Sequence, residues 1–403
     1  MSALPFDILP IIASSLPHNP TSLKAACLVS HQWKLAFQPA LFFGVHINNE
    51  VASNKFLAVI QTHPPFASLV RSLELQFTGG PINTIFMKLP LLQSLTISHR
   101  RALPPKLCTA LRLTLGSKHI TSLTLQDVKS FPLQILSEIV GLKHFSSIGS
   151  SYCGRERALA KPIDYYLLIQ QHTTGSQLRS LSLSSMGPDK HELLQYLIHP
   201  KCVIDLRDVK HLTFHSDPQL DHTMFCSLVS MIPSTLEHLT YRAPKQPTVG
   251  VNGMGLQLLN DFRLSRFTHL QSFELYTYLN TTHDFTEIDL SPWSTAFIAN
   301  LSTPSRLESL EIRCSWNYIT SKYAPTAPAS ARRLGFTSVP DAARQRWDDL
   351  DSFLSSKAFP MLKVVSFYVA SIDIDSPKDV MAIKLPRLEK EGKLRVVMLS
   401  EGV

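Results

Sequence analysis

The chain of 403 residues has none of the short motifs that mark many enzymes and metal proteins. It has no Gly-x-Ser-x-Gly turn, no His-Glu-x-x-His and no closely spaced Cys/His quartet. Its only glycine cluster, Gly250-Val-Asn-Gly253-Met-Gly255, follows a proline-rich loop instead of a strand, which argues against phosphate binding. We therefore predict a protein that is not an enzyme, with no catalytic residue, no metal ligand and no cofactor.

Cysteine is scarce, and the cysteines lie far apart with no Cys-x-x-Cys pair. Several of them fall inside apolar runs, which favours buried, reduced thiols over a disulfide framework or a zinc site. The six positions are Cys27, Cys108, Cys153, Cys202, Cys226 and Cys314. This usage predicts an intracellular protein, cytoplasmic or nuclear.

Long hydrophobic runs are absent from the sequence. No apolar run approaches the roughly 20 residues that a membrane-spanning helix needs. The start, MSALPFDILP, has no basic segment and carries Asp7 where a secretory signal would be apolar. We therefore expect a soluble protein without a membrane partner.

Only 17% of the residues are charged, and the net charge of +8 is spread thinly. Lys and Arg never form a run of five, whereas nucleic-acid binding depends on clustered positive charge. A nucleic-acid-binding repeat protein is thus the weakest interpretation, and a mildly basic surface is the simpler one. With 44% hydrophobic residues the chain is globular, and its length favours two domains or a repeat architecture.

The chain begins with an amphipathic pattern. Asp7 can accept hydrogen bonds from the free N–H groups of a first helical turn. Ile8, Leu9, Ile12 and Leu16 then recur at helical spacing and form one apolar stripe. The pattern predicts a first helix that ends at the Pro-rich segment 17–20.

Two more helices are predicted before residue 45. One covers about 23–29, with Thr21 or Ser22 as its cap, and the next is capped by Ser30 and stops before Pro39. Helices this short cannot bury all their apolar side chains against one another. Some of those side chains must face another surface, which is either a partner or the rest of the same chain.

These residues carry a recognisable pattern over about residues 3–43. It reads Leu4-Pro5-x-Asp7-Ile8-Leu9, then Ile12 and Leu16, then Leu23-x-x-x-Cys27-Leu28-Val29-Ser30-x-x-Trp33, then Pro39-x-Leu41-Phe42. In this order it resembles the F-box, the module by which substrate receptors of SCF-type cullin-RING ubiquitin ligases bind the Skp-family adaptor. The resemblance implies an adaptor-binding set made of Leu4, Pro5, Ile8, Leu9, Ile12, Leu28, Val29 and Trp33. Lys34 stands where the family often has Arg.

The remaining chain repeats a pattern of apolar, two residues, apolar, one residue, apolar. Ten copies start at Val70, Leu92, Ile120, Leu178, Val209, Leu236, Leu270, Leu307, Leu362 and Leu394, and Leu142 starts a degenerate copy. The last two apolar positions of a copy are two residues apart and therefore share one face of a strand. Starts that lie roughly 20 to 40 residues apart suit parallel strands joined by crossovers.

The segments between the copies, such as KFLAVIQTH, LQILSEIV, ELLQYLIH, MFCSLVSMI and LQLLNDF, have helical spacing. One strand and one helix per repeat resemble an irregular leucine-rich-repeat solenoid over residues 51–403, with a parallel sheet on its concave face. The Asn or Cys that usually follows the strand is mostly absent. The corresponding residues are Thr78, Arg100, Val128, Met186 and Asp217.

Strand residues between the pattern positions are expected to point away from the helices. The early ones are small and neutral, whereas the later ones include charged and aromatic groups of the kind that anchor interfaces. These later residues form the candidate substrate-binding set: His211, His215, His238, Arg242, Glu274, Tyr276, Glu311, Arg313 and Tyr368. The simpler alternative is that these residues bind nothing, because outward strand positions are polar in any half-exposed sheet.

The spacing breaks between Leu307 and Leu362, where a segment at about 315–347 is rich in Pro, Ala and Ser. It is predicted to be a long insertion. Its arginines (Arg332, Arg333, Arg344 and Arg346) could contact an acidic or phosphorylated partner, although a surface loop without function is the simpler interpretation.

The combined expectation is an α/β protein with a three-helix F-box at 1–45 and an irregular leucine-rich-repeat solenoid at 51–403, as in fungal F-box receptors. The resemblance implies a non-catalytic receptor that binds the Skp-family adaptor, and through it a cullin scaffold, and holds an unknown protein substrate. The alternative is a leucine-rich-repeat scaffold whose N-terminal helices only cap the solenoid.

Overall fold

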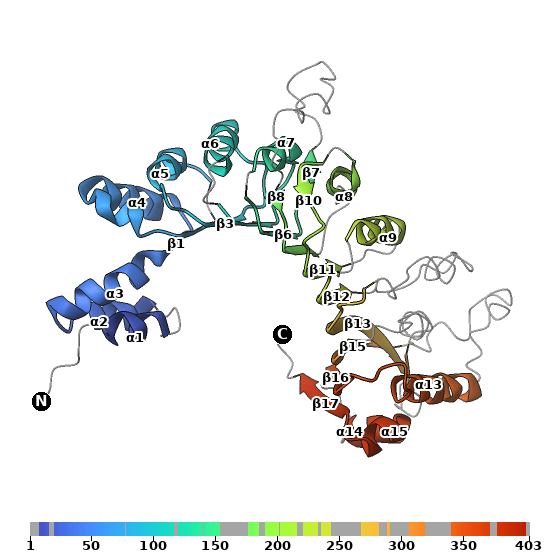
Figure 1. Ribbon diagram of the computed structural model, residues 1–403. Coiled ribbons are helices and arrows are strands. Elements are labelled where there is room, and N and C mark those ends of the chain that lie inside the picture. The colour runs from blue at the N-terminus through green and yellow to red at the C-terminus, as the bar shows by residue number, and fades with distance from the viewer. Residues whose placement is uncertain are drawn as a thin grey trace, which may run out of the picture. The chain divides into compact units, whose positions relative to one another are not determined.

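The computed structural model describes residues 8–15, 20–76, 78–116, 120–139, 141–153, 176–184, 190–200, 202–215, 221–232, 235–242, 267–281, 288–290, 306–318, 340–370 and 377–399. The chain divides into two compact units. Unit 1 comprises residues 1–178 and 186–205, and unit 2 comprises residues 179–185 and 206–403. The expected α/β class is confirmed, because helices alternate with parallel strands in both units (Figure 1).

Unit 1 begins with three helices: α1 (Leu9–Ser15), α2 (Pro20–Cys27) and α3 (His31–Phe43). They share a small apolar core of Leu9, Ala13, Leu23, Ala26, Ala36 and Phe37. Ser30 caps α3, as predicted, by accepting a hydrogen bond from the backbone N–H of Trp33 at 3.3 Å.

Two predicted boundaries of these helices are wrong. The second helix begins at Pro20 instead of after Thr21 or Ser22, which suits proline because the first turn has no intrahelical acceptor for its N–H. The third helix does not stop before Pro39 but continues to Phe43. Ala40 and Leu41, beyond the proline, pack on the three-helix core, and this packing outweighs the lost backbone hydrogen bond.

The rest of unit 1 alternates strands and helices. The main strands are β1 (Gly44–Ile47), β2 (Ser72–Leu75), β3 (Ser94–Ser98), β4 (Ser122–Gln126) and β6 (His144–Ile148), paired in parallel in that order. The helices are α4 (Glu50–Thr62), the 3-10 helix η2 (Pro64–Ser68), α5 (Ile82–Lys88), α6 (Pro105–Leu115), α7 (Leu133–Ser137) and α8 (Lys190–Ile198). Two short parallel pairs join β5 (Phe131–Pro132) to β7 (Tyr152–Cys153) and β8 (Ser176–Gln177) to β10 (Ile204–Asp205).

The repeated apolar pattern explains these strands. Leu73 and Leu75 of β2 are fully buried, and their register partners Leu95 and Ile97 of β3 are too. The residues between them are half-exposed, as the alternation of side chains along a strand requires. Each copy of the pattern thus adds one strand whose pattern residues are buried on one face of the sheet.

Buried hydroxyl groups form hydrogen bonds in the turns after two of the strands. Ser150, fully buried, accepts a hydrogen bond from the N–H of Val128 at 3.1 Å, and Ser151 accepts one from the N–H of Ser130 at 3.0 Å. Thr78, 7% exposed, lies 3.1 Å from His99 through Oγ1 and Nε2. These contacts give buried polar groups at the turns the partners that they need.

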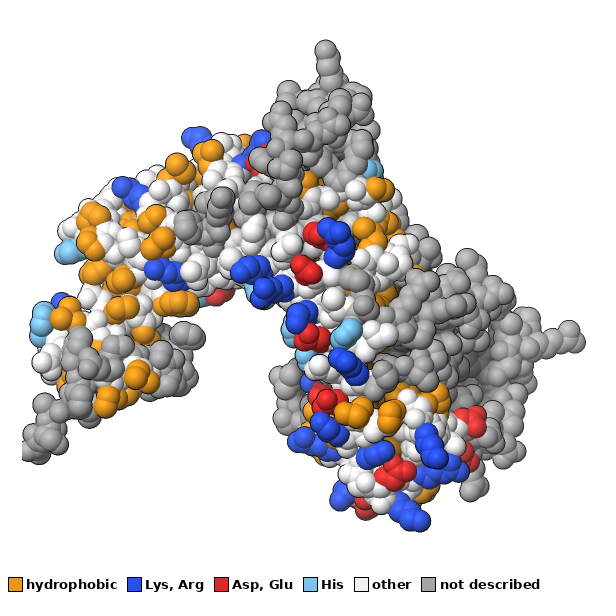
Figure 2. Space-filling view, in the orientation of Figure 1, with side chains coloured by type: hydrophobic (Ala, Val, Ile, Leu, Met, Phe, Trp, Pro, Cys, Tyr) orange, Lys and Arg blue, Asp and Glu red, His pale blue; other side chains and the backbone are white. Residues whose placement is uncertain are grey.

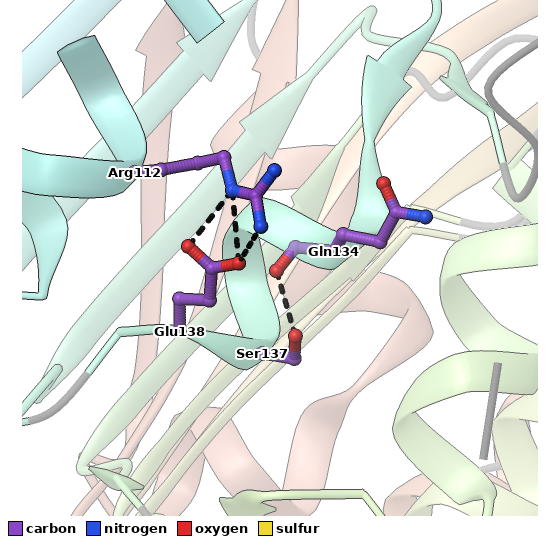
Figure 3. Close-up of polar contacts among 4 residues, drawn as sticks. All are labelled: Arg112, Gln134, Ser137 and Glu138. Carbon is purple, nitrogen blue, oxygen red and sulfur yellow. Dashed lines mark hydrogen bonds and ion pairs between the residues drawn. The ribbon is translucent and has the colours of Figure 1, made fainter. Parts of the chain in front are cut away.

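Neighbouring helices are also joined at their surface. Arg112 of α6 donates to both carboxylate oxygens of Glu138 just after α7, with Nε–Oε1 and Nε–Oε2 distances of 2.9 and 3.0 Å (Figure 3). Ser137 closes the same turn through a 2.7 Å hydrogen bond to the carbonyl of Gln134. The bidentate geometry holds one helix against the next.

Unit 2 continues the alternation. Its parallel strands are β9 (Ser180–Ser184), β11 (His211–His215), β12 (His238–Arg242), β13 (Ser272–Thr281), β15 (Ser309–Tyr318), β16 (Val364–Ala370) and β17 (Leu394–Leu399), and β14 (Ile288–Leu290) pairs antiparallel with β13. Its described helices are α9 (Asp221–Met231), α13 (Pro340–Leu354), α14 (Pro377–Lys384) and α15 (Pro386–Lys390).

Helix α13 lies against the sheet and against α15. Trp347, 1% exposed, packs near the ring of Phe367 on β16, with a 6.3 Å distance between ring centroids. Asp351, 2% exposed, accepts hydrogen bonds from the backbone N–H groups of Arg387 at 2.9 Å and Leu388 at 3.1 Å. A carboxylate at the start of α15 satisfies donors that have no partner within the helix.

The last copy of the repeat is out of the predicted register. Leu394 pairs with Val365 and Val397 pairs with Tyr368, so Val397 shares a face with an outward residue instead of lying inward. Gly392, with φ of 67°, turns the chain directly into β17 and leaves no room for the first pattern position before the strand. The predicted copy starting at Leu394 is therefore wrong by three positions.

The segment 315–347 is not all loop. Strand β15 extends to Tyr318, and α13 begins at Pro340, so both ends of the segment belong to regular elements. Arg332 and Arg333 lie outside the described residues, as does the predicted helical stretch LQLLNDF. Across the described ranges, none of the helices has the length and apolar character needed to cross a membrane.

Candidate functional site

An exposed apolar surface lies on the N-terminal helices. Leu28 and Val29, in the turn between α2 and α3, are 86% and 64% exposed, and Ile11 of α1 is 65% exposed. Ile8 and Leu35 are also exposed. We call these five residues the helical surface, and hydrophobic side chains are visible on these helices in Figure 2.

The predicted adaptor-binding residues are divided between this surface and the core. Ile8, Leu28 and Val29 are exposed, whereas Leu9 is 1% exposed and belongs to the small core. Ile12 and Trp33 are half-buried and pack against that core, and the Trp33 ring stacks on Phe37 at 5.1 Å between centroids. Leu4 and Pro5 lie outside the described residues.

Sequence reasoning missed Ile11 and Leu35 as members of the helical surface. Both are large apolar residues on helices whose core positions are filled by other side chains. A strict helical projection of residues 8–16 and 31–43 would have placed them opposite the buried stripe. Five exposed large apolar residues on so small a segment make it a candidate docking surface.

A second candidate lies on unit 2, where the register of five strands aligns predicted residues in a row. His215 of β11 pairs with Arg242, Arg242 with Tyr276, Tyr276 with Arg313, and Arg313 with Tyr368. We call these five residues the outer row. All are half-buried, and all alternate with fully buried pattern residues on the same strands.

Arginine and tyrosine side chains stack along the outer row. The guanidinium carbon of Arg313 lies 4.5 Å from the ring centroid of Tyr368 and 5.5 Å from that of Tyr276. Arg242 lies 5.9 Å from the Tyr276 centroid, and the His215 ring lies 6.0 Å from it. Guanidinium groups at this range interact favourably with an aromatic face and are held in place by it.

Two carboxylates in the next row anchor the centre of the outer row. Glu274 forms an ion pair with Nε of Arg313, and Glu311 lies 3.5 Å from Nη2 of the same side chain. Thr240 donates to Glu274 Oε2 at 3.0 Å, a contact that sequence reasoning missed because it joins strands 34 residues apart. Figure 2 shows acidic and basic side chains side by side over the strands of unit 2.

The surrounding residues shift the pKa values of three side chains in the outer row. Burial, and then the charge of Arg242, lowers the pKa of His215 to about 4, against a weaker opposing effect of Glu274. Burial, and then Glu274, raises the pKa of Tyr276. Burial acts to lower the pKa of Arg313, but Glu274, Tyr276 and Glu311 together outweigh burial and the pKa is raised. At neutral pH the imidazole of His215 is therefore neutral, the Tyr276 phenol keeps its proton and Arg313 keeps its positive charge.

His211 and His238 do not belong to the outer row but form a pair at the start of their strands. Their rings are parallel within 3° and their centroids are 4.5 Å apart. Burial, and then the neighbouring His211, lowers the pKa of His238. Beside them Lys210 and Glu237 form an ion pair at 2.6 Å.

Within the described part of the chain, no group of three or more His, Cys, Asp or Glu side chains is placed to hold a metal ion. Cys27, Cys108, Cys202, Cys226 and Cys314 form no disulfide bonds with one another. Burial raises the pKa of Cys202 to about 11, and that of Cys314 is raised by burial as well. Both thiols are therefore protonated at neutral pH, a poor starting point for nucleophilic chemistry.

The helical surface is apolar and exposed, whereas the outer row combines charged and aromatic side chains and is half-buried. Surfaces of these two kinds suit the binding of macromolecules better than the enclosure of a small ligand. Searches against models of known protein families and against curated proteins found no match to this chain.

Proposed function

We propose that this protein is a non-catalytic substrate receptor of an SCF-type cullin-RING ubiquitin ligase. Its N-terminal helices form an F-box that binds the Skp-family adaptor, and through the adaptor a cullin scaffold. The strands that follow form an irregular leucine-rich-repeat solenoid that holds a protein substrate. The observation that carries the proposal is the exposure of Leu28 and Val29 beside a helical core that is already filled.

The adaptor-binding part rests on sequence pattern and burial together. Leu28 and Val29 are two of the residues for which the F-box resemblance implies adaptor contact, and they expose large apolar side chains. A chain that leaves such residues in water loses hydrophobic stabilisation, which a partner restores at about 25 cal/mol per Å² of apolar area covered. Covering these side chains is therefore favourable and supports binding of the adaptor.

The substrate-binding part rests on the outer row. Arg242, Tyr276 and Arg313 belong to the residue types that most often anchor protein interfaces, and the stacking holds them in place before a partner arrives. A receptor of this kind acts by raising the effective concentration of its substrate near the conjugating machinery, without chemistry of its own.

One observation favours the alternative scaffold, in which the helices only cap the repeats. The ring of Phe42, at the end of α3, stacks on that of Phe66 in η2 at 4.6 Å between centroids. The end of α3 thus packs on the first repeat. This contact leaves the turn at Leu28 and Val29 uncovered, and for that reason we prefer the receptor to the scaffold.

The test is co-purification of the full chain with a Skp-family adaptor. The wild type is compared with a Leu4→Ala, Pro5→Ala double variant and with Leu113→Ala as a control. Leu113 is 64% exposed on α6, away from the three N-terminal helices. We expect the wild type and the control to retain the adaptor and the double variant to lose it. A folded wild-type chain that does not bind the adaptor would leave only the scaffold.

A further inference from the structure

The described charges on the three N-terminal helices are all positive. Lys24 of α2 and Lys34 of α3 are both exposed. No Asp or Glu occurs among the described residues of α1, α2 and α3, and Asp7 is the only acidic residue of the sequence from 1 to 49. No described carboxylate forms an ion pair with either lysine. The apolar helical surface therefore belongs to a segment with an excess of positive charge.

Both lysines lie close to the turn that carries Leu28. Lys24 is one helical turn before Leu28, and the N–H of Leu28 donates to the carbonyl of Ala25 at 3.0 Å, so the chain stays coiled up to this residue. Burial raises the pKa of Cys27 at the end of α2, and the charge of Lys34 opposes that effect, which places Lys34 near the same turn. The two ammonium groups thus lie at the rim of the helical surface.

The sign of this charge argues against a second copy of the chain as the occupant of the helical surface. In a two-fold symmetric dimer the same surface lies on both partners, so the lysines of the two copies would approach one another. Like charges brought together in an interface are unfavourable. A protein that carries carboxylates around an apolar groove has the complementary charge.

The number of lysines argues against an anionic membrane as the occupant. Segments that bind such membranes through charge present clusters of about four to eight Lys and Arg residues. The described residues of the three helices carry Lys24 and Lys34 and no arginine. Their apolar stripes are also occupied by a shared core, in which Leu9, Leu23 and Phe37 are buried. A protein partner suits this surface better.

We propose that the partner of the helical surface is a protein that surrounds an apolar groove with Asp and Glu side chains, and that Lys24 and Lys34 pair with these carboxylates at the rim. The inference rests on the proposed function, because it specifies the chemistry by which the adaptor meets the same surface. Exposed ion pairs at a rim add little affinity, but they speed the encounter of two proteins and fix their orientation. The apolar residues then set the lifetime of the complex.

The experiment follows association of the full chain with a purified Skp-family adaptor by stopped-flow fluorescence. Ionic strength is varied from about 0.01 M to about 0.15 M, over which the Debye length falls from about 30 Å to about 8 Å. The wild type is compared with a Lys24→Gln, Lys34→Gln double variant and with Lys88→Gln, which changes an exposed lysine on α5.

At the lowest salt we expect the double variant to associate roughly fivefold more slowly than the wild type, because rim charges act mainly on the association rate. The difference should shrink as salt is added, and the dissociation rates should agree within about twofold. Lys88→Gln should match the wild type at every salt concentration.

The outcomes separate this inference from the proposed function. If the wild type and the double variant bound the adaptor at the same rate at low salt, the acidic rim would be overturned while adaptor binding stood. A folded wild-type chain that does not bind the adaptor would overturn both. Binding of the wild type to vesicles of anionic phospholipid as tight as its binding to the adaptor would also overturn the proposal, since that would mark a membrane surface.

Discussion

The guanidinium carbon of Arg313 lies 4.5 Å from the ring centroid of Tyr368, its register partner on the neighbouring strand. The same guanidinium forms an ion pair with Glu274. One side chain thus joins three strands of unit 2 through an aromatic face and two carboxylates. The stability of this part of the sheet should depend on it.

Replacing Arg313 with Met should lower the free energy of unfolding by about 1–3 kcal/mol, because Glu274 and Glu311 would keep their partly buried charges without a cation. Urea denaturation of the wild type, Arg313→Met, Glu274→Gln and the double variant measures this. The double variant should lose less free energy of unfolding than the two single variants lose together, because Arg313 and Glu274 are in contact. Strict additivity would show that the ion pair contributes nothing.

Asp351 should be a strong point of stability in the C-terminal helices. Asp351→Ala removes the acceptor for the backbone N–H groups of Arg387 and Leu388, and we expect a loss of about 1–2 kcal/mol. Asp348→Ala, an exposed position on the same helix, is the control and should change stability by less than about 0.5 kcal/mol. Equal effects at the two positions would refute the capping role.

The buried hydroxyl of Ser150 should stabilise unit 1. Ser150→Ala leaves the buried N–H of Val128 without its acceptor and should cost about 1–3 kcal/mol of unfolding free energy. Ser137→Ala, which removes a hydrogen bond to a helical carbonyl that retains other options, serves as the comparison. If thermal unfolding gave the same midpoint for both variants, the hydrogen bond from Val128 to Ser150 would not contribute to stability.

The free energy of unfolding should depend on pH through His215. Its pKa is lowered to about 4 in the folded chain, while an unfolded imidazole titrates near its ordinary value of about 6.5. Between these values the unfolded state binds more protons, so stability falls as pH is lowered from 6.5 toward 4. His215→Gln should reduce this decline relative to the wild type. Identical slopes for the two proteins over this range would contradict the burial of a neutral imidazole.

Much of the fold follows from local pattern. The repeated apolar spacing located the strands because inward positions must alternate with outward ones, as in β2 and β3. The pattern failed at Leu394, in β17, which pairs only with β16 among the described strands, and at Pro39, where core packing outweighs a local helix-breaking preference. Local conformational propensity predicts structure poorly where contacts between residues distant in the sequence determine stability.

The candidate sites could be predicted only in part. The members of the outer row were expected as outward residues, but the stacking of Arg313 between Tyr276 and Tyr368 depends on strand register across large gaps in sequence. Likewise, the roles of Ser150 and Ser151 depend on which backbone N–H groups meet them after folding. Pairings of that kind are not encoded in any short motif.

The most direct test of the receptor proposal is the affinity of the full chain for a purified Skp-family adaptor, measured by titration calorimetry. The wild type is compared with Leu28→Asp, Val29→Asp and with Leu113→Asp, whose changed residue is exposed on α6. We expect the wild type and Leu113→Asp to bind, with at least tenfold weaker binding when a charge is placed at Leu28 or Val29. Equal affinity for all four folded proteins, or none for the wild type, would contradict it.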